Sequence, residues 1–462
     1  MVYGTPPPKK TRIPLNGYVP EWLEPAELSA TYAPASGSAN YASTAALAAK
    51  ADVRAIRVGT RSRLHAAPIK HMIPANMPGH GWSLQSDVSN NASSDLNDTG
   101  DFLIGSQALR ITTAGTAAYV GWDKTLTAPI DASDCDFRFW FKLEDPDRRL
   151  ANIQIIIGDS ALTWRSTLTP FSYSTATSYI QSPLQSGRWN IIDVPQGAGW
   201  TPTGTPNWAA VQRVLIKASD TAGKPITVRL GGAAFTRRDH NGRFPNGVAT
   251  LTFDDTYDAA YTYARAKMDQ YGYRGTLFPI VDRIGMAGKL TLAQVQAMYQ
   301  NGWDVAGHAY TNANHALGLP AMTQAQRLAE LENIKAWMDA NNFQTQAFAY
   351  PLGNHDVATE ADVAAYFDCG RLAFLQRDTP QAIAQPYAIQ AANAGTQQAT
   401  LNTFVDRAVA GKGWINFVFH DIKATGATGN DISQANFDAL LAYLATSGIA
   451  VRTMSEVLTT IT

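Results

Sequence analysis

The stretch Val248-Ala249-Thr250-Leu251-Thr252-Phe253-Asp254-Asp255 runs from an apolar segment directly into two adjacent carboxylates. Its β-branched and aromatic residues predict a buried strand over 248–253. Strands and helices then alternate to the end of the chain, which predicts parallel strands joined by right-handed crossovers, in a barrel or an open sheet. Further strands are expected at 275–281, 303–307, 347–350, 371–375, 388–390, 415–419 and 449–451, and helices at 259–270, 292–300, 324–340, 404–410 and 434–445.

Upstream of this region the pattern changes to short β-like runs. Apolar and polar residues alternate at 137–143 and 226–230, and Gly, Asp, Ser or Pro separate the runs. This pattern is typical of an antiparallel, jelly-roll-like β-sandwich, expected over 76–238, which is a possible carbohydrate-binding module. The further runs lie at 108–111, 153–157, 189–194 and 214–217, and Trp122, Trp200 and Trp208 are candidates either for stacking on sugar rings or for core packing.

The first 75 residues show a third sequence pattern. They contain Pro6-Pro7-Pro8 and one Ala-rich stretch, 43–52, which could form a short helix. Because this segment cannot bury a core of its own, we expect an attachment segment that a partner, or a homotrimer or dimer of the chain, would order. The three expected parts are therefore 1–75, 76–238 and 246–462, with a polar linker at 237–247 and no signal-peptide pattern at the N-terminus.

The composition excludes several classes of protein. Of the 462 residues, 45% are hydrophobic and only 16% charged, and the net charge is −1. A nucleic-acid binder would show a basic excess, and no apolar run reaches the ~18 residues of a membrane span. Cys135 and Cys369 fall in different predicted domains, which rules out a disulfide framework and predicts two buried small side chains. The scarcity of charge is typical of extracellular and virion proteins.

Polar residues gather at the carboxyl ends of the predicted strands. Asp254 and Asp255 follow the first strand, His308 the third, and His420 the strand at 415–419. In β/α folds these ends carry the functional site. Carboxylate and imidazole ligands suit Zn²⁺, and three of them leave a position for a water whose pKa the metal lowers. Taken singly, each residue could instead cap a helix or be structural.

These residues belong to an ordered series of motifs. The motifs are Thr252-Phe253-Asp254-Asp255, His308 after 302–307, Phe348-Ala349-Tyr350-Pro351-Leu352-Gly353 and Phe417-Val418-Phe419-His420-Asp421. In order and spacing they resemble the motifs of the polysaccharide deacetylase (NodB-homology) carbohydrate esterases over 246–462. The resemblance implies a distorted (β/α)7 barrel that removes acetyl groups from glycans with a divalent metal, for which zinc is expected.

The resemblance also implies roles for individual residues. Asp254 corresponds to the catalytic base and Asp255 to the first metal ligand. His308 corresponds to the first histidine ligand, and His420 to the general acid. The backbone N–H of Leu352 lies where the family places an oxyanion donor, which helps only if it points at the developing negative charge.

The sequence departs from the family at three positions. The second histidine ligand usually follows the first by four residues, where Asn312 stands; we favour His315, which a loop over 310–314 could deliver. Thr256 replaces the usual Gly, so we expect the turn there to avoid a positive φ. Ala349 replaces the Arg that usually steadies the base, and Arg371 is the candidate to supply that guanidinium.

Other residues near the predicted mouth of the barrel have two possible roles. His355 and Asp356 lie either in a solvated loop, which is favoured, or against the substrate. Tyr257 and Tyr310 are candidates for sugar stacking, whereas Trp303 and Trp414 stand at strand starts and are expected in the core.

The sequence thus predicts a metal-dependent hydrolase that deacetylates a surface or cell-wall polysaccharide. The segment order also resembles a bacteriophage tail protein, which implies an extracellular or virion-associated enzyme that acts on host glycan and docks through 1–75. A secreted bacterial cell-wall deacetylase is a second hypothesis. A third is a catalytically inactive glycan-binding protein. Neither a nucleic acid nor a membrane is expected as a partner.

Overall fold

The computed structural model describes residues 68–172, 182–196, 199–238, 243–373, 379, 381, 383, 385–395 and 398–461. These residues belong to one compact unit, His65–Ile461. The helix expected at 43–52 and nearly all of the expected attachment segment lie outside the described residues.

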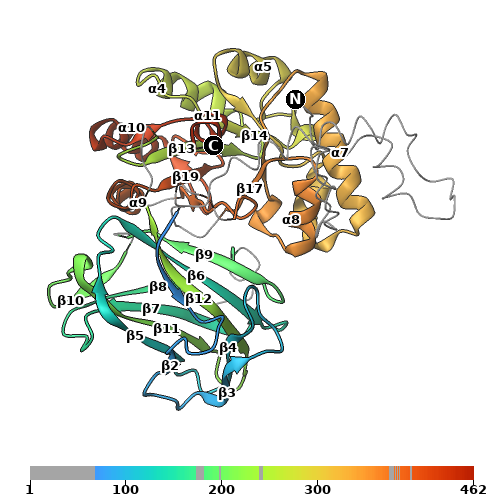
Figure 1. Ribbon diagram of the computed structural model, residues 1–462. Helices are drawn as coiled ribbons and strands as arrows, with labels where there is room; N and C mark the ends of the chain where they lie inside the picture. Colours follow the sequence, from blue (N-terminus) through green and yellow to red (C-terminus); the bar gives the residue numbers. More distant parts are fainter. Residues whose placement is uncertain are drawn as a thin grey trace, which may run out of the picture. The chain divides into compact units, whose positions relative to one another are not determined.

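Residues 69–237, the N-terminal β region, form two six-stranded antiparallel sheets (Figure 1). The β-runs expected from the sequence are confirmed as strands. The expected attachment segment extends too far, because β1 pairs with β12 inside the first sheet. That sheet contains β1 (Ile69–Pro74), β3 (Asn91–Asp98), β4 (Ala108–Thr113), β6 (Cys135–Glu144), β9 (Trp189–Val194) and β12 (Thr227–Arg237). The second contains β2 (Ser83–Leu84), β5 (Val120–Ile130), β7 (Leu150–Gly158), β8 (Arg165–Ser172), β10 (Thr201–Thr203) and β11 (Val211–Asp220).

A single hydrophobic cluster in this region contains residues from both sheets. Phe137, Phe139 and Phe141 point to one face of β6, as the two-residue period of a strand requires. Trp122 from the other sheet meets the edge of Phe141 at 6.5 Å between ring centroids. Sugar stacking by Trp122 is therefore wrong, because its side chain is buried. Trp200 and Trp208 pack edge to face against each other and against the same core.

Residues 248–461, the C-terminal α/β region, have the parallel strands and alternating helices that the sequence predicts. β13 (Val248–Asp254) is central to a six-stranded sheet of order β15-β14-β13-β19-β18, with β22 beside β13. Helices surround these strands (Figure 1). The other strands are β14 (Thr276–Phe278), β15 (Asp304–Val305), β16 (Ala347–Ala349), β17 (Cys369–Arg371), β18 (Ala392–Asn393), β19 (Trp414–Phe419), β20 (Ile422–Lys423), β21 (Ile432–Ser433) and β22 (Ala450–Val451).

The helices of this region follow the sequence pattern with some additions. Those expected at 292–300 and 324–340 have the expected bounds, and the one expected at 259–270 begins as a π-helix. Three α-helices, α6 (Asn312–Leu317), α8 (Val357–Ala364) and α11 (Met454–Ile461), were not expected. The helices are η2 (Ala260–Arg265), α4 (Ala266–Asp269), η3 (Val281–Arg283), α5 (Leu292–Gln300), α6 (Asn312–Leu317), η4 (Leu319–Ala321), α7 (Gln324–Ala340), η5 (Pro351–Gly353), α8 (Val357–Ala364), α9 (Gln398–Gly411), α10 (Gln434–Ser447) and α11 (Met454–Ile461).

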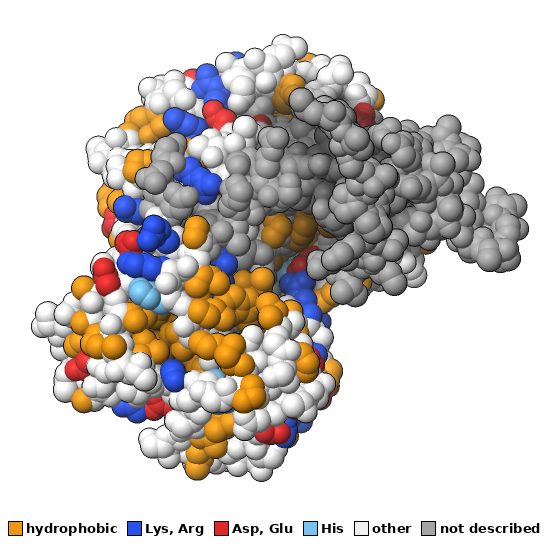
Figure 2. All heavy atoms as spheres, in the orientation of Figure 1, with side chains coloured by type: hydrophobic (Ala, Val, Ile, Leu, Met, Phe, Trp, Pro, Cys, Tyr) orange, Lys and Arg blue, Asp and Glu red, His pale blue; other side chains and the backbone are white. Residues whose placement is uncertain are grey.

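Several simpler expectations are also settled. Trp303 and Trp414 are buried, as predicted for core residues. Cys135 and Cys369 are buried free thiols, and burial raises the pKa of Cys135 to about 12. No helix among the described residues is long and apolar enough to cross a membrane. Figure 2 shows charged side chains scattered thinly over the face in view, which accords with the 16% of charged residues.

Candidate functional site

The central strand β13 delivers the two carboxylates. All seven of its residues are buried, and the strand ends at Asp254. The chain then takes left-handed conformations at Asp255 (φ 66°) and Thr256 (φ 65°), so the expectation of a negative φ at Thr256 is wrong. The side chain explains why threonine is tolerated, since its hydroxyl accepts from Ile280 N (2.8 Å) and donates to Ile280 O (3.0 Å). This sharp turn gives the two neighbouring carboxylates different surroundings.

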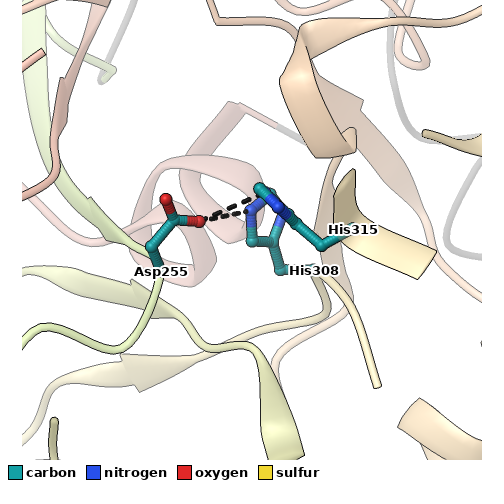
Figure 3. A group of neighbouring side chains, drawn as sticks. All are labelled: Asp255, His308 and His315. Atoms are coloured by element: carbon teal, nitrogen blue, oxygen red, sulfur yellow. Dashed lines mark ion pairs between the residues drawn. The ribbon is translucent and has the colours of Figure 1, made fainter. Parts of the chain in front are cut away.

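Asp255, His308 and His315 point toward one another (Figure 3). The Oδ1 atom of Asp255 lies 3.4 Å from Nε2 of His308 and 3.2 Å from Nε2 of His315. One ligand atom from each residue lies within 4.8 Å of the other two. The sequence could place these residues at the same end of the sheet, and the structure brings them within reach of a single ion.

The surroundings of this triad fit a divalent cation. Oδ1 of Asp255 is buried and has no hydrogen-bond partner among the described residues, although both imidazoles lie at ion-pair distance. Nδ1 of His308 donates to the carbonyl of Ala349 (2.8 Å), which leaves Nε2 to face Asp255. Burial alone would raise the pKa of Asp255, but His308 and His315 outweigh it and hold that pKa far below its ordinary value. A cation among the three atoms would meet the same need for positive charge.

The seven-residue interval between the histidines is spanned by a short helix, not by the expected loop. Thr311 caps α6, and His315 is the fourth of the six residues of that helix. The buried carboxylate of Glu330 accepts from Tyr310 N (2.6 Å) and Thr311 N (3.2 Å). Asn312 is exposed, and its backbone N–H donates to Asp282. Two carboxylates therefore hold the segment from which His315 projects, and neither was identified from the sequence.

Weakening this support is expected to loosen metal binding. Glu330→Gln removes the negative charge that accepts from the backbone of 310–311 and from the Asn314 amide (2.6 Å). Because changes next to metal ligands typically cost 10–100-fold in affinity, we expect the Kd for Zn²⁺ to rise roughly tenfold. A competition titration against a chromogenic chelator measures it. Glu332→Gln, on the exposed face of the same helix, is the control; equal Kd values for the two variants would contradict this role.

Asp254 is paired with a buried arginine. Nη2 of Arg371 lies 2.7 Å from Oδ1 and 2.6 Å from Oδ2 of Asp254, and both side chains are almost fully buried. Ala349 and Arg371 are direct partners in the register of β16 and β17. The resemblance implies an arginine at position 349 in β16. In this chain the guanidinium comes instead from Arg371, the partner of Ala349 on the neighbouring strand β17. Asp254 is ion-paired and oriented while Asp255 faces the histidines.

His420 and Leu352 each follow the end of a strand, β19 and β16 respectively. Phe253 and Phe419 are register partners in β13 and β19, so Asp254 and His420 occupy adjacent positions one residue further on. Nδ1 of His420 is buried without a hydrogen-bond partner among the described residues. Leu352 follows β16 within η5 and has a left-handed backbone (φ 59°). The roles of both residues stay predictions.

One expectation for the predicted mouth of the barrel is wrong. His355 is neither in a solvated loop nor exposed to a substrate, because only 1% of its surface is accessible. One face of the Tyr257 ring is covered by the ammonium of Lys289, 3.1 Å from its centroid, and stacking of a sugar on this ring stays a prediction. Burial, followed by the charge of Arg283, lowers the pKa of Lys289 to about 8. Tyr310 is half-buried and packs against the core.

Part of this region matches the sequence model of a known protein family. Residues 241–367 match the sequence model of the family "Polysaccharide deacetylase". This match supports the NodB-homology family for the C-terminal part of the chain. Its motifs are those quoted above for the NodB-homology carbohydrate esterases.

Relatives of the deacetylase domain share limited parts of the chain. YxkH of Bacillus subtilis (strain 168), which is named after the polysaccharide deacetylases, is 32% identical over 111 residues, 24% of this chain and 38% of that protein. A gellan lyase from Bacillus sp is 23% identical over 214 residues, 43% of this chain and 8% of that enzyme. Among solved structures, a family 4 acetyl xylan esterase from Clostridium thermocellum, in complex with a cobalt ion, is 19% identical over 46% of this chain and 90% of its own, with a TM-score of 0.34.

Proposed function

We propose that this protein is a metal-dependent carbohydrate deacetylase that hydrolyses acetyl groups on a surface or cell-wall polysaccharide. The observation that carries the proposal is the meeting of Asp255, His308 and His315 beside an arginine-paired Asp254. A divalent cation, zinc in the first place, would be held by the three side chains. When bound, it supplies Lewis acidity, which lowers the pKa of water and polarises an acetyl carbonyl.

The chain's own residues divide the remaining chemistry. The carboxylate of Asp254 accepts a proton from the attacking water, and Arg371 orients that carboxylate. The imidazole of His420 gives a proton to the departing sugar oxygen or nitrogen. The backbone N–H of Leu352 stabilises negative charge on the acetyl oxygen. The pairing of Asp254 with Arg371 speaks against the inactive, glycan-binding alternative, which rested partly on Ala349.

The architecture proposed with this function is a β-sandwich followed by a distorted (β/α)7 barrel. The single hydrophobic cluster shared by the two N-terminal sheets supports the sandwich. The described C-terminal strands form no closed sheet. Isolated parallel bridges, Gly307–Phe348 and Arg371–Ile389, lie on the path along which a barrel would close. A glycan-binding role for the sandwich, an extracellular or virion location, and docking of a homotrimer through 1–75 remain proposals about the protein's setting.

Acetate release tests the proposed function. The purified chain, stripped of metal and then supplied with Zn²⁺, Co²⁺, Ni²⁺ or Mn²⁺, is incubated with a panel of O- and N-acetylated glycans. We expect acetate to be released from at least one glycan, to stop with chelator, and to resume with metal. Asp255→Ala is expected to reduce the rate at least a hundredfold. A chain that retains no divalent ion, releases no acetate and still adsorbs to glycan would establish the binding alternative.

A further inference from the structure

The buried His355 connects the deacetylase domain to the N-terminal β region. Its Nδ1 lies 2.9 Å from Oε1 of Glu360 in α8, and its Nε2 lies 2.7 Å from the carbonyl oxygen of Ser182. The side chain of Gln185 reaches the same carbonyl (3.0 Å) and the same Nε2 (3.1 Å). Both ring nitrogens are thus engaged, one inside the domain and one outside it.

An arginine from the N-terminal β region completes the cluster. Arg188 binds Glu360 through two parallel contacts, Nη1 to Oε2 at 2.5 Å and Nη2 to Oε1 at 3.0 Å. Burial alone would raise the pKa of Glu360, but His355, followed by Arg188, outweighs it and lowers that pKa. Glu360 is therefore an ionised carboxylate held on both sides. Paired contacts of this kind fix direction as well as distance.

The cluster lies at one end of the segment that carries Leu352. At the other end, Ala349 N donates to Gly307 O (2.9 Å) and Tyr350 N to Arg371 O (3.1 Å), so the start of the segment is fixed by its neighbouring strands. Between the two ends, Leu352 holds its left-handed backbone, which a non-glycine residue keeps only when its surroundings enforce it. His355 lies three residues later, is held at both ring nitrogens, and has its ring centroid 5.3 Å from that of Tyr350.

We infer that Arg188, Glu360 and His355 are positioning residues, through which the N-terminal β region holds the backbone N–H of Leu352 in the geometry needed for deacetylation. The inference rests on the proposed function. Without Arg188, Glu360 would lose one of its two partners, and His355 and the segment 351–354 would gain freedom. Because an oxyanion donor acts only when it is aimed at the developing charge, this freedom should lower kcat more than it changes KM.

The test compares two matched arginines in the full chain. The Arg188–Glu360 pair has side-chain exposures of 25% and 10%, and the Arg213–Asp123 pair has 27% and 12% but lies within the second sheet. Arg188→Gln is expected to lower kcat roughly tenfold, with KM and bound metal unchanged. Arg188→Lys should restore part of the loss, and Arg213→Gln should keep the wild-type kcat. Equal kcat values for the two glutamine variants would overturn the inference.

A second measurement does not depend on activity. Hydrogen–deuterium exchange of the peptide covering 350–358 should speed up in Arg188→Gln and stay at the wild-type rate in Arg213→Gln. Unchanged exchange in Arg188→Gln would also overturn the inference. A wild-type chain that releases no acetate from any glycan would instead contradict the proposed function. If Arg188→Gln fails to fold, as judged by circular dichroism, Glu360→Gln takes its place in both measurements.

Discussion

His315→Ala is expected to abolish metal retention, whereas Asn312→Ala is expected to leave it intact. His315 Nε2 lies 3.2 Å from Oδ1 of Asp255 and completes a three-ligand group, while Asn312 is exposed. Removing one of three protein ligands leaves Asp255 and His308 alone, which is too few to hold a catalytic zinc against dialysis. Elemental analysis of the dialysed variants, expressed as metal per chain, gives the result directly.

Two further variants make this comparison decisive. His71→Ala removes a histidine of the N-terminal β region whose Nε2 contacts the carbonyl of Asp131, and it should keep its metal. His308→Ala should lose its metal like His315→Ala. If Asn312→Ala lost the ion and His315→Ala kept it, the ligand would be the residue at the family's usual four-residue interval. In that case the contact between His315 and Asp255 would be an ion pair without a metal.

The fold was predictable where a local pattern decides it. The helices predicted at 292–300 and 324–340 have the bounds of α5 and α7, and in the structure Thr291 and Thr323 each form a capping box at the start of these helices. The parallel order of the strands also followed from the β/α alternation. The bounds of the strand expected at 388–390 were wrong. Only Ile389 forms a bridge there, and the strand itself is Ala392–Asn393.

The candidate site was predictable to the level of its residue types and strand ends. Asp254, Asp255, His308 and His420 could be placed because each follows an apolar strand, and strand ends meet at one edge of a parallel sheet. The sequence also offered His315 and Arg371 as candidates. The structure brings both to the positions where those hypotheses require them, although their roles await the variants described above.

The rest of the site depends on contacts between residues far apart in the chain. No pattern near Glu330 links it to the backbone of Tyr310, 20 residues away. Nor does any pattern link His355 to Ser182, 173 residues away. The positive φ of Thr256 was missed for a related reason, since its reciprocal hydrogen bonds with Ile280 form only when β13 and β14 are paired. A polar residue next to a motif is therefore easily misread as solvated.

His420→Ala is expected to reduce deacetylation at least a hundredfold while the metal stays bound. His420 follows β19 at the position adjacent to Asp254, and it is not among the three residues grouped around a possible ion. A general acid typically contributes about 10²–10⁴ in rate, because the departing sugar oxygen or nitrogen is a poor leaving group until it is protonated. The measurements are kcat for acetate release and metal per chain on the same sample.

The leaving group separates an acid role from a structural one. 4-Nitrophenolate departs without a proton, so His420→Ala should lose far less activity on 4-nitrophenyl acetate than on an acetylated glycan. Asp254→Asn should lose activity on both substrates, because the attacking water needs its base in either case. Equal losses of His420→Ala on the two substrates would rule out proton donation to the leaving group. Loss of metal from His420→Ala would mean that this histidine is a ligand, and Asp254 would then face the metal together with it.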